Sequence, residues 1–244
     1  INTGYEIPTS STVLNDLTTH AGGVLQSGTP TGGTVSTLYT QGFEGAPADW
    51  TTEIVTNPTG TVPAISYVTS TSSTYPTVTP SQGTQCVQFN SYYCESGDQL
   101  RLKKSTSPLS TIGNTNVTVV FDWYVDAGYS TAIDYVTVQW SLNGTTWSNS
   151  TTYYRYSATA GWVTQNCVLP IGAENQSTVY VAFLFTSLYG NNCHLDNMKV
   201  NVTTPTAPVP STYTINGTLD LTNGTYAIGS GNSLVLNGDI SGSN

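Results

Sequence analysis

Hydrophobic and polar residues alternate along the middle of the chain with a period of two, the period of a β-strand with one buried face. The clearest cases are residues 117–125 and 135–142. The apolar residues that share a face are Val119, Phe121, Trp123 and Val125 in the first segment and Val136, Val138 and Trp140 in the second. Both segments predict core strands of a β-sandwich, and no segment shows a convincing helical pattern.

Comparable patterns predict further strands between residues 41 and 203. With the two segments above, the predicted ranges are 84–89, 99–103, 117–125, 135–142, 162–169, 179–186 and 194–202. Residues 179–186 are apolar on both faces, which is typical of a central strand covered on each side. The predicted fold class is all-β: a jelly-roll β-sandwich over residues 41–203, with an extended N-terminal arm and a small C-terminal β segment.

The two flanks differ in composition from this middle region. Residues 1–40 mix Thr, Ser and Gly with weak periodicity, which predicts an extended arm. Residues 204–211 are proline-spaced and predict a linker, whereas residues 212–244 hold short alternating runs between Asn-Gly pairs, which indicate hairpins or tight coils. So short a segment needs a neighbour: the sandwich, a continuing β-solenoid, or another subunit that receives a strand.

Charge is scarce and acidic, with 8% charged residues, a net charge of -9 and a pI near 4.2. Nucleic acid and anionic membranes are therefore poor partners. The one basic cluster, Arg101, Lys103 and Lys104, is expected on a solvated strand edge. No apolar run is long enough to span a bilayer, and Ile1 is expected to be the processed start of a mature chain.

The cysteines match neither a zinc site nor a redox CxxC motif; they are Cys86, Cys94, Cys167 and Cys193. Two disulfides are predicted. Of the three possible pairings, Cys86 with Cys94 and Cys167 with Cys193 is favoured, because each closes a short loop between neighbouring strands. Disulfides imply a secreted, extracellular protein. Sequons for N-linked glycans occur at Asn116, Asn143, Asn149, Asn175, Asn201, Asn216 and Asn223.

Short motifs spread over the middle region form a recognisable set. They are Gly-Phe-Glu-Gly at 42–45, Asp-Trp-Thr at 49–51, Asp-Tyr-Val-Thr-Val at 134–138, Trp-Ser-Leu-Asn-Gly-Thr-Thr-Trp at 140–147, Phe-Leu-Phe-Thr-Ser at 183–187, Tyr-Gly-Asn-Asn at 189–192 and Leu-Asp-Asn at 195–197. The set resembles the bacterial jelly-roll domains called cleaved-adhesin or choice-of-anchor J modules, which are similar in shape to MAM domains. The resemblance implies an extracellular sandwich used in adhesion or appended to larger secreted proteins, without catalysis.

The resemblance also implies a calcium site. In that family the opening Glu and the closing Asp help to hold a calcium ion, and Glu44 and Asp196 match those positions. Calcium accepts hard oxygen ligands of this kind. On its predicted strand Asp196 alternates onto the face of Met198 and Val200, where an unpaired carboxylate is costly. The alternative interpretation is that backbone donors or Lys199 satisfy Asp196.

Catalytic patterns are sparse. His20 and His194 belong to no HExxH motif, and no GxSxG elbow occurs. Asp122, Asp126 and Asp134 lie near one predicted turn and are the only candidates for the carboxylate pair of a glycosidase, although solvated loop carboxylates are commoner. No catalytic residue is predicted.

Tyrosines gather in two stretches of the middle region. They are Tyr92 and Tyr93 in the first and Tyr153, Tyr154 and Tyr156 in the second. Tyrosine offers a large apolar face with a polar end, so these side chains are candidates for an aromatic surface that contacts sugar or protein. The alternative interpretation is that they partly cover the core.

Three functions follow from these patterns. The first is a structural or adhesive surface glycoprotein, a filament subunit joined to its own copies or to other surface proteins and glycans by strand addition through its terminal segments. The second is a calcium-supported carbohydrate-binding module of a larger secreted protein, with the tail starting a solenoid. The third, a hydrolase, rests only on the loop aspartates. The prediction is a non-enzymatic extracellular protein with N-linked glycans and calcium.

Overall fold

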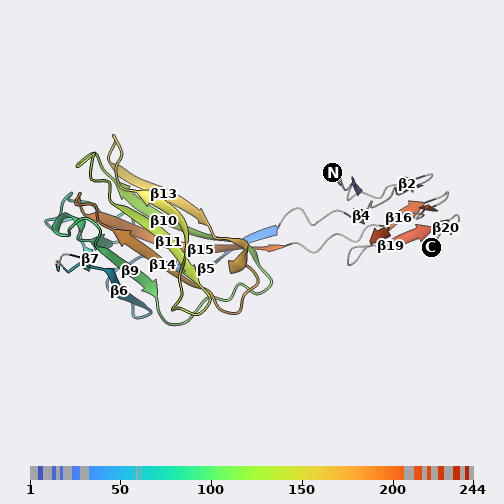
Figure 1. The fold of residues 1–244 in the computed structure, drawn as a ribbon, viewed down its shortest axis with the longest axis horizontal. Coiled ribbons are helices and arrows are strands. Elements are labelled where there is room, and N and C mark those ends of the chain that lie inside the picture. The colour runs from blue at the N-terminus through green and yellow to red at the C-terminus, as the bar shows by residue number, and fades with distance from the viewer. Residues whose placement is uncertain are drawn as a thin grey trace. The chain divides into compact units, whose positions relative to one another are not determined.

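A computed structural model of the chain describes residues 33–205 except 59 and 61, together with short strands before and after this range. The chain divides into two compact units, one of Thr34–Thr204 and one of Ile1–Gly33 with Pro205–Asn244. Both units are built from β-strands (Figure 1). No helix among the described residues is long and apolar enough to cross a membrane.

The unit Thr34–Thr204 is a jelly-roll sandwich of two sheets, which confirms the predicted fold class. The six-stranded sheet has the order β13 (Gly161–Val168), β10 (Thr115–Val125), β15 (Cys193–Pro205), β8 (Cys86–Phe89) and β7 (Ile65–Val68), and β5 (Gly33–Gln41) also pairs with β15. The five-stranded sheet has the order β12 (Ser148–Tyr154), β11 (Tyr135–Ser141), β14 (Tyr180–Thr186), β9 (Gln99–Lys104) and β6 (Trp50–Thr56). Along both orders neighbouring strands run antiparallel.

Aromatic side chains form the centre of the core between the sheets. Phe121 and Phe183 meet edge to face with ring centroids 5.0 Å apart, and Phe89 stacks on Phe185 at 5.3 Å. All four are fully buried. Burying one such side chain stabilises the fold by about 1.5–3 kcal/mol, so the inward-facing apolar positions of β8, β10 and β14 contribute directly to stability.

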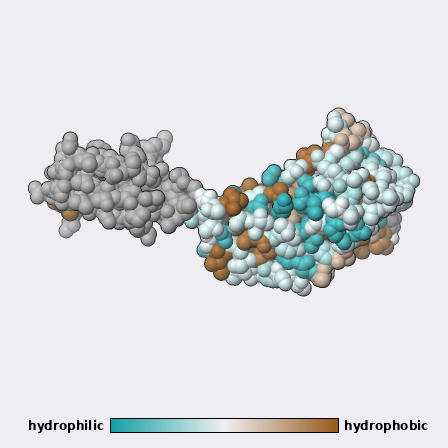
Figure 2. All heavy atoms as spheres, turned by 180° about the vertical axis from the view of Figure 1, so that it is seen from behind, coloured by the Kyte–Doolittle hydropathy of each residue, from teal (hydrophilic) through white to brown (hydrophobic). Residues whose placement is uncertain are grey.

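The strands predicted from apolar alternation are all present, and β14 is the buried central strand that its sequence indicates. Four strands of the sandwich were not predicted, namely β5, β6, β7 and β12. Strands β5, β6 and β12 are rich in Thr and Ser and largely exposed, so their sequences lack a clear apolar face. Strand β7 has only four residues, too few to show a period. Figure 2 shows one face of the sandwich coloured by hydropathy. Most of this surface is pale or teal, hence weakly to strongly hydrophilic, and the apolar residues form separate brown spots.

The basic cluster does not lie on a solvated strand edge, because β9 is an interior strand between β14 and β6. Lys104 is only 2% exposed; its Nζ donates to Asp49 Oδ2 at 2.6 Å and lies 4.5 Å from the centroid of the Tyr39 ring. Arg101 is buried too, and its guanidinium donates to Gln139 and Glu53. Each of these two cations therefore has a carboxylate partner, as burial of a cation requires, although the Glu53 side chain that pairs with Arg101 is itself 42% exposed.

The predicted disulfides are absent, and all four cysteines are free and buried. Cys86 packs in a small cluster with Val68 and Val78, whereas Cys94 belongs to the main core. Cys167 on β13 pairs with Val119 of β10, whereas Cys193 on β15 lies on the other side of β10, two residues before Leu195, which pairs with Trp123. Two strand spacings and about six residues along the strands therefore separate the two cysteines, about 20 Å and beyond the reach of a disulfide. The two cysteines follow one another along the chain but do not lie side by side in the sheet.

The second unit consists of three parallel three-stranded sheets. Their orders are β1 (Tyr5–Ile7), β4 (Val24–Ser27), β18 (Thr225–Ala227); β19 (Ser233–Leu236), β16 (Thr212–Ile215), β2 (Val13–Leu14); and β20 (Ile240–Ser241), β17 (Leu219–Asp220), β3 (Leu17–Thr18). Following the chain, β2, β3 and β4 visit the three sheets in turn, and β16, β17 and β18 repeat that circuit. This recurrence is the strand pattern of a β-solenoid.

The two flanks therefore form one unit, whereas the sequence predicted a separate arm and a separate C-terminal segment. Parallel pairs such as Thr214 with Val13 and Tyr226 with Leu25 join residues about 200 positions apart in the chain. In the sequence, the strands of the sandwich follow β4 and precede β16. Most of the predicted linker, from residue 206 onward, lies outside the described residues.

Candidate functional site

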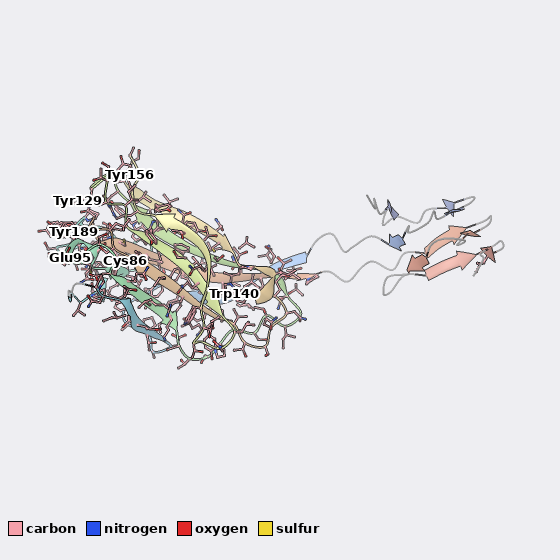
Figure 3. All side chains as sticks on the ribbon, in the orientation of Figure 1. Cys86, Glu95, Tyr129, Trp140, Tyr156 and Tyr189 are labelled. Atoms are coloured by element: carbon pink, nitrogen blue, oxygen red, sulfur yellow. The ribbon has the colours of Figure 1, made fainter. Side chains whose placement is uncertain are left out.

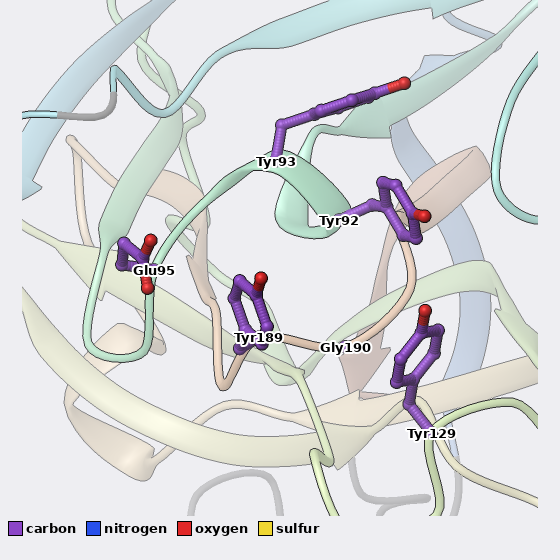
Figure 4. A pocket seen from close by; sticks show the side chains of 6 residues that line it. All are labelled: Tyr92, Tyr93, Glu95, Tyr129, Tyr189 and Gly190. Atoms are coloured by element: carbon purple, nitrogen blue, oxygen red, sulfur yellow. The ribbon is translucent and has the colours of Figure 1, made fainter.

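A pocket of about 350 Å³ lies where three loops meet at one end of the sandwich. One loop joins β8 to β9 and contains the 3-10 turn η1 (Ser91–Tyr93), the second joins β10 to β11, and the third joins β14 to β15. The lining residues are Tyr92, Tyr93, Glu95, Tyr129, Tyr189 and Gly190. Figure 3 places Glu95, Tyr129 and Tyr189 at this end and Trp140 away from it, and Figure 4 shows the tyrosines and Glu95 around an open space.

The tyrosines of the pocket support one another through ring contacts. Tyr92 stacks on Tyr75 with centroids 4.4 Å apart and meets the edge of Tyr93 at 5.1 Å. Tyr129 lies 6.2 Å from Tyr92 in a T-shaped arrangement, and its phenol raises the pKa of Tyr92. Such offset and edge contacts are favourable and fix ring orientation. Tyr93, Tyr129 and Tyr189 nevertheless stay 59%, 50% and 58% exposed, so they present ring surface to a ligand.

Two pocket tyrosines hold an unusual backbone conformation. Tyr129 has φ of 51° and Tyr189 has φ of 68°, in the left-handed region that bulky residues rarely occupy. Holding a residue there costs about 1–3 kcal/mol, and such strain gathers at ligand-binding sites. The surrounding structure must therefore hold both loops firmly in place.

A buried ion cluster supplies that support. Arg155 is fully buried; its Nε donates to Asp134 Oδ2 at 2.9 Å and its Nη1 to Asp126 Oδ2 at 2.8 Å. The remaining guanidinium hydrogen atoms reach the carbonyl oxygens of Gly128 and Ala132, inside the loop that carries Tyr129. The guanidinium therefore binds that loop at several points, which fixes its path.

The third pocket loop, between β14 and β15, is tied to the same cluster through Asp134. Asp134 Oδ1 accepts the backbone N–H groups of Leu188 and Gly190, which flank Tyr189, at 2.7 and 3.1 Å. It also accepts the Ser91 hydroxyl at 2.7 Å, at the start of the turn that carries Tyr92 and Tyr93. Only glycine fits at position 190, because a Cβ there would meet Asp134 Oδ2 and the Ala132 carbonyl oxygen. One carboxylate thus aligns the loops that carry the tyrosines.

The structure brings together only part of the predicted aromatic surface. Tyr92 and Tyr93 lie in the pocket, but Tyr153 covers the core, with its ring 5.2 Å from Phe121 and its hydroxyl bonded to the Asn166 carbonyl oxygen. Tyr154 and Tyr156 do not line the pocket either. Tyr75, Tyr129 and Tyr189 were missed. They lie in loops, whose sequences show no hydrophobic periodicity. The positive φ of Tyr129 and Tyr189 and the stacking of Tyr75 on Tyr92 are visible only in the structure.

The aspartates of the hydrolase hypothesis are structural. Asp126 and Asp134 are the buried partners of Arg155, and Asp122 accepts hydrogen bonds from Ser81, Thr164 and Asn197. Solvated loop carboxylates, the commoner case, are therefore not what the structure shows. His194 is fully buried, and burial lowers its pKa to about 3, so it stays neutral beside Gln88. His20 lies outside the described residues.

Asp196 does not lie on the core face that its alternation predicts. Asn197 has φ of 48°, and the β10–β15 register shifts there, so that Leu195 and Met198 both point into the core. Such a bulge reverses the alternation for one residue. Asp196 therefore shares the outer face of the sheet with Asp122, its cross-strand partner.

The geometry around Glu44 and Asp196 bears on the predicted calcium ion. Glu44 Oε2 accepts the backbone N–H and hydroxyl of Thr84, and Asp196 accepts the N–H groups of Gln82 and Asn197. Burial raises the pKa of Asp196 to about 6, and the nearby charge of Glu44 adds to this rise. Carboxylate oxygens are the type of ligand atom that calcium prefers, and both side chains lie beside the same loop. No group of three or more His, Cys, Asp or Glu within the described part of the chain could hold a metal, so calcium stays a prediction.

The described sequons differ in exposure. Asn116, Asn143, Asn149 and Asn175 are exposed and Asn201 is half-buried, with Asn201 Oδ1 accepting the Thr37 hydroxyl. Asn216 and Asn223 lie outside the described residues. Exposure is what a glycan acceptor needs. N-linked glycosylation stays a prediction.

Comparison with known proteins shows likeness in fold only. No family model and no curated protein matches the chain. The K2 cleaved adhesin domain of Lys-gingipain is similar at 18% identity over 66% of this chain and 96% of that domain, with a TM-score of 0.49. The K3 domain from Porphyromonas gingivalis shares 20% identity over 69% and 99%, with a TM-score of 0.47. CBM27-1 of Caldicellulosiruptor saccharolyticus, solved with mannohexaose, shares 14% identity over 71% and 99%, with a TM-score of 0.44.

Proposed function

We propose that the sandwich is a non-catalytic carbohydrate-binding module of a secreted protein. The observation that carries this proposal is the pocket in which Tyr92, Tyr93, Tyr129 and Tyr189 expose ring surface beside the carboxylate of Glu95. A sugar ring has an apolar C–H face and a rim of hydroxyl groups. The tyrosine rings match the first, and the phenol and carboxylate oxygens match the second.

The architecture of the pocket suits a ligand of modest size that binds without reorganising the protein. A volume of about 350 Å³ accommodates a short piece of oligosaccharide. The Arg155 cluster holds the pocket loops before any ligand arrives. Loops that are already ordered lose little entropy on binding, so more of the stacking energy becomes affinity.

A glycan array probed with the full chain, followed by calorimetry on the hits, tests the proposal. Tyr93→Ala is expected to weaken binding of a hit about tenfold, the loss typical of an aromatic residue at the centre of a binding site. Tyr154→Ala removes an equally exposed tyrosine outside the pocket and is expected to leave binding unchanged. An array without any hit, or equal losses in both variants, would refute this function.

Calcium is a separate part of the proposal and rests on Glu44 and Asp196. Burial disfavours the charged form of the Asp196 carboxylate. A calcium ion bound beside this carboxylate would offset its charge, so added calcium is expected to stabilise the sandwich. Thermal unfolding of the full chain with calcium or with a chelator measures this. The expected result is a higher unfolding temperature in calcium that is lost in Glu44→Gln and kept in the distant control Glu174→Gln. Identical curves with calcium and chelator would remove calcium from the account.

Assembly into a surface filament is the second candidate function. The strand order of the second unit, with its three parallel sheets, favours this function. The outer strands of its three sheets are β1 and β18, β2 and β19, and β3 and β20. Outer strands carry backbone groups that another chain can pair with. Strands of the N-terminal flank already pair with strands of the C-terminal flank, as β2 does with β16 and β4 with β18, so new chains would add at the outer strands. Polymers that grow with concentration in analytical ultracentrifugation would support assembly, and a monomer at every concentration would exclude it.

A further inference from the structure

The charges around the tyrosine pocket are unbalanced. Among the described residues that line it, Glu95 carries the one charged side chain. Asp98, three residues further along the same loop, is fully buried: its Oδ2 accepts the Glu95 backbone N–H at 2.9 Å and its Oδ1 has no hydrogen-bond partner. Neither carboxylate forms an ion pair within the described residues. The rim of the pocket is therefore negative.

The buried ion cluster adds to this negative potential. Asp126 and Asp134 share the single guanidinium of Arg155, so two carboxylates face one cation. The guanidinium itself is fully buried and cannot meet a ligand. Burial raises the pKa of the Cys94 thiol to about 12, and the charges of Asp98, Asp134 and Glu95 add to this rise.

Tyrosine rings reinforce the same preference. The face of an aromatic ring is electron-rich and attracts a cation within about 6 Å of its centroid. In Figure 4 Glu95 and Tyr189 stand on one side of the open space, Tyr92 and Tyr129 on the other, and Tyr93 at its rim. A ligand between them meets ring faces and one carboxylate, and no cationic side chain among the lining residues. This combination favours an alkylammonium group over a neutral or an anionic one.

We infer that the pocket selects sugars that carry a free amine, of the glucosamine type, and holds the ammonium group between the tyrosine rings and the Glu95 carboxylate. This inference rests on the proposed function and adds the substrate class to it. An N-acetylated sugar of the same length keeps the ring and its hydroxyl groups but lacks the charge. The difference between the two ligands therefore isolates the ammonium contact.

Calorimetry of the full chain with glucosamine oligosaccharides and with N-acetylglucosamine oligosaccharides of equal length tests the inference. Glu95→Gln is expected to weaken binding of the amine about fivefold, the effect of one partly exposed ion pair, and to weaken binding of the N-acetylated ligand less, because glutamine keeps a carbonyl acceptor for hydroxyl groups but has no charge. Glu174→Gln removes the same charge at a residue outside the pocket and is the matched control. Added salt is expected to weaken only the amine-bearing ligand.

The outcomes separate this inference from the proposed function. Tighter binding of the amine-bearing ligand, lost in Glu95→Gln and kept in Glu174→Gln, supports both. Equal or tighter binding of the N-acetylated or another neutral sugar, with no response to Glu95→Gln, overturns the ammonium site and leaves the carbohydrate-binding module standing. Absence of binding to every sugar overturns both.

Discussion

Asp49 and Lys104 show what a single charge pair contributes to this sandwich. The ammonium of Lys104 is 2% exposed, and Asp49 is its only carboxylate partner among the described ion pairs. The Thr106 carbonyl oxygen accepts a further hydrogen bond, and the Tyr39 ring covers the charge. Removing one member of such a pair leaves the other charge buried, which costs more than the intact pair contributes.

Asp49→Asn is expected to lower the free energy of unfolding by about 3 kcal/mol at neutral pH, the lower end of the range for buried pairs because Asp49 is partly exposed. Burial alone would raise the pKa of Asp49, but the hydrogen bonds from Lys104 and Tyr39 hold that pKa below its usual value. Stabilisation from a depressed pKa is present above the unfolded-state value and is lost as pH falls through the folded-state value. The wild type and Asp49→Asn are therefore expected to converge in acid.

Urea unfolding at neutral and at strongly acid pH measures this convergence. Glu53→Gln is the matched control, because Glu53 bridges Arg101 and Lys103 at a more exposed site and is expected to cost less. A gap between wild type and Asp49→Asn that is the same at both pH values would contradict the role given to the pair.

At the scale of elements, the strands differ from the loops in how far their sequences reveal them. Strands β10, β11 and β14 were predictable because each has an apolar face or is apolar throughout. The pocket was predictable only at Tyr92 and Tyr93. Its other tyrosines lie on loops whose paths depend on Arg155, and no local pattern relates Arg155 to Asp126 and Asp134 across the fold.

Two further misses have the same physical origin. The position of Asp196 depends on the bulge at Asn197, a backbone conformation that alternation cannot anticipate. The cysteine pairing depends on strand order, and β10 stands between the strands of Cys167 and Cys193. Sequence periodicity reports which face a residue occupies in a regular strand. It does not report which strands are neighbours or where a strand is irregular.

The Arg155 cluster is the element that orders the pocket, and substitution there tests this role. Arg155→Met is expected to lower the free energy of unfolding by about 3–5 kcal/mol, because Asp126 and Asp134 remain buried without a cation. Adding Asp126→Asn and Asp134→Asn to Arg155→Met is expected to recover part of the loss. Urea unfolding quantifies both changes. No recovery in the triple variant would show that packing of the Arg155 side chain, and not charge, holds the loops.

At the scale of the whole molecule, the chain combines a sandwich with a parallel unit whose strands come from both flanks. The sandwich has its own aromatic core and its own two sheets. A unit with a separate core is expected to unfold as a separate cooperative transition. Calorimetric scanning of the full chain is therefore expected to show two transitions, of which residues 34–204 expressed alone reproduce one. A single transition for the full chain would contradict the division.

A crystal structure of the full chain with a bound oligosaccharide would locate the sugar that we propose to bind between the pocket tyrosines. We expect a sugar ring in contact with the faces of Tyr93 and Tyr189, within reach of the Glu95 carboxylate, and pocket loops that keep their present paths. A sugar bound on the outer face of the five-stranded sheet, with the pocket empty, would contradict the account.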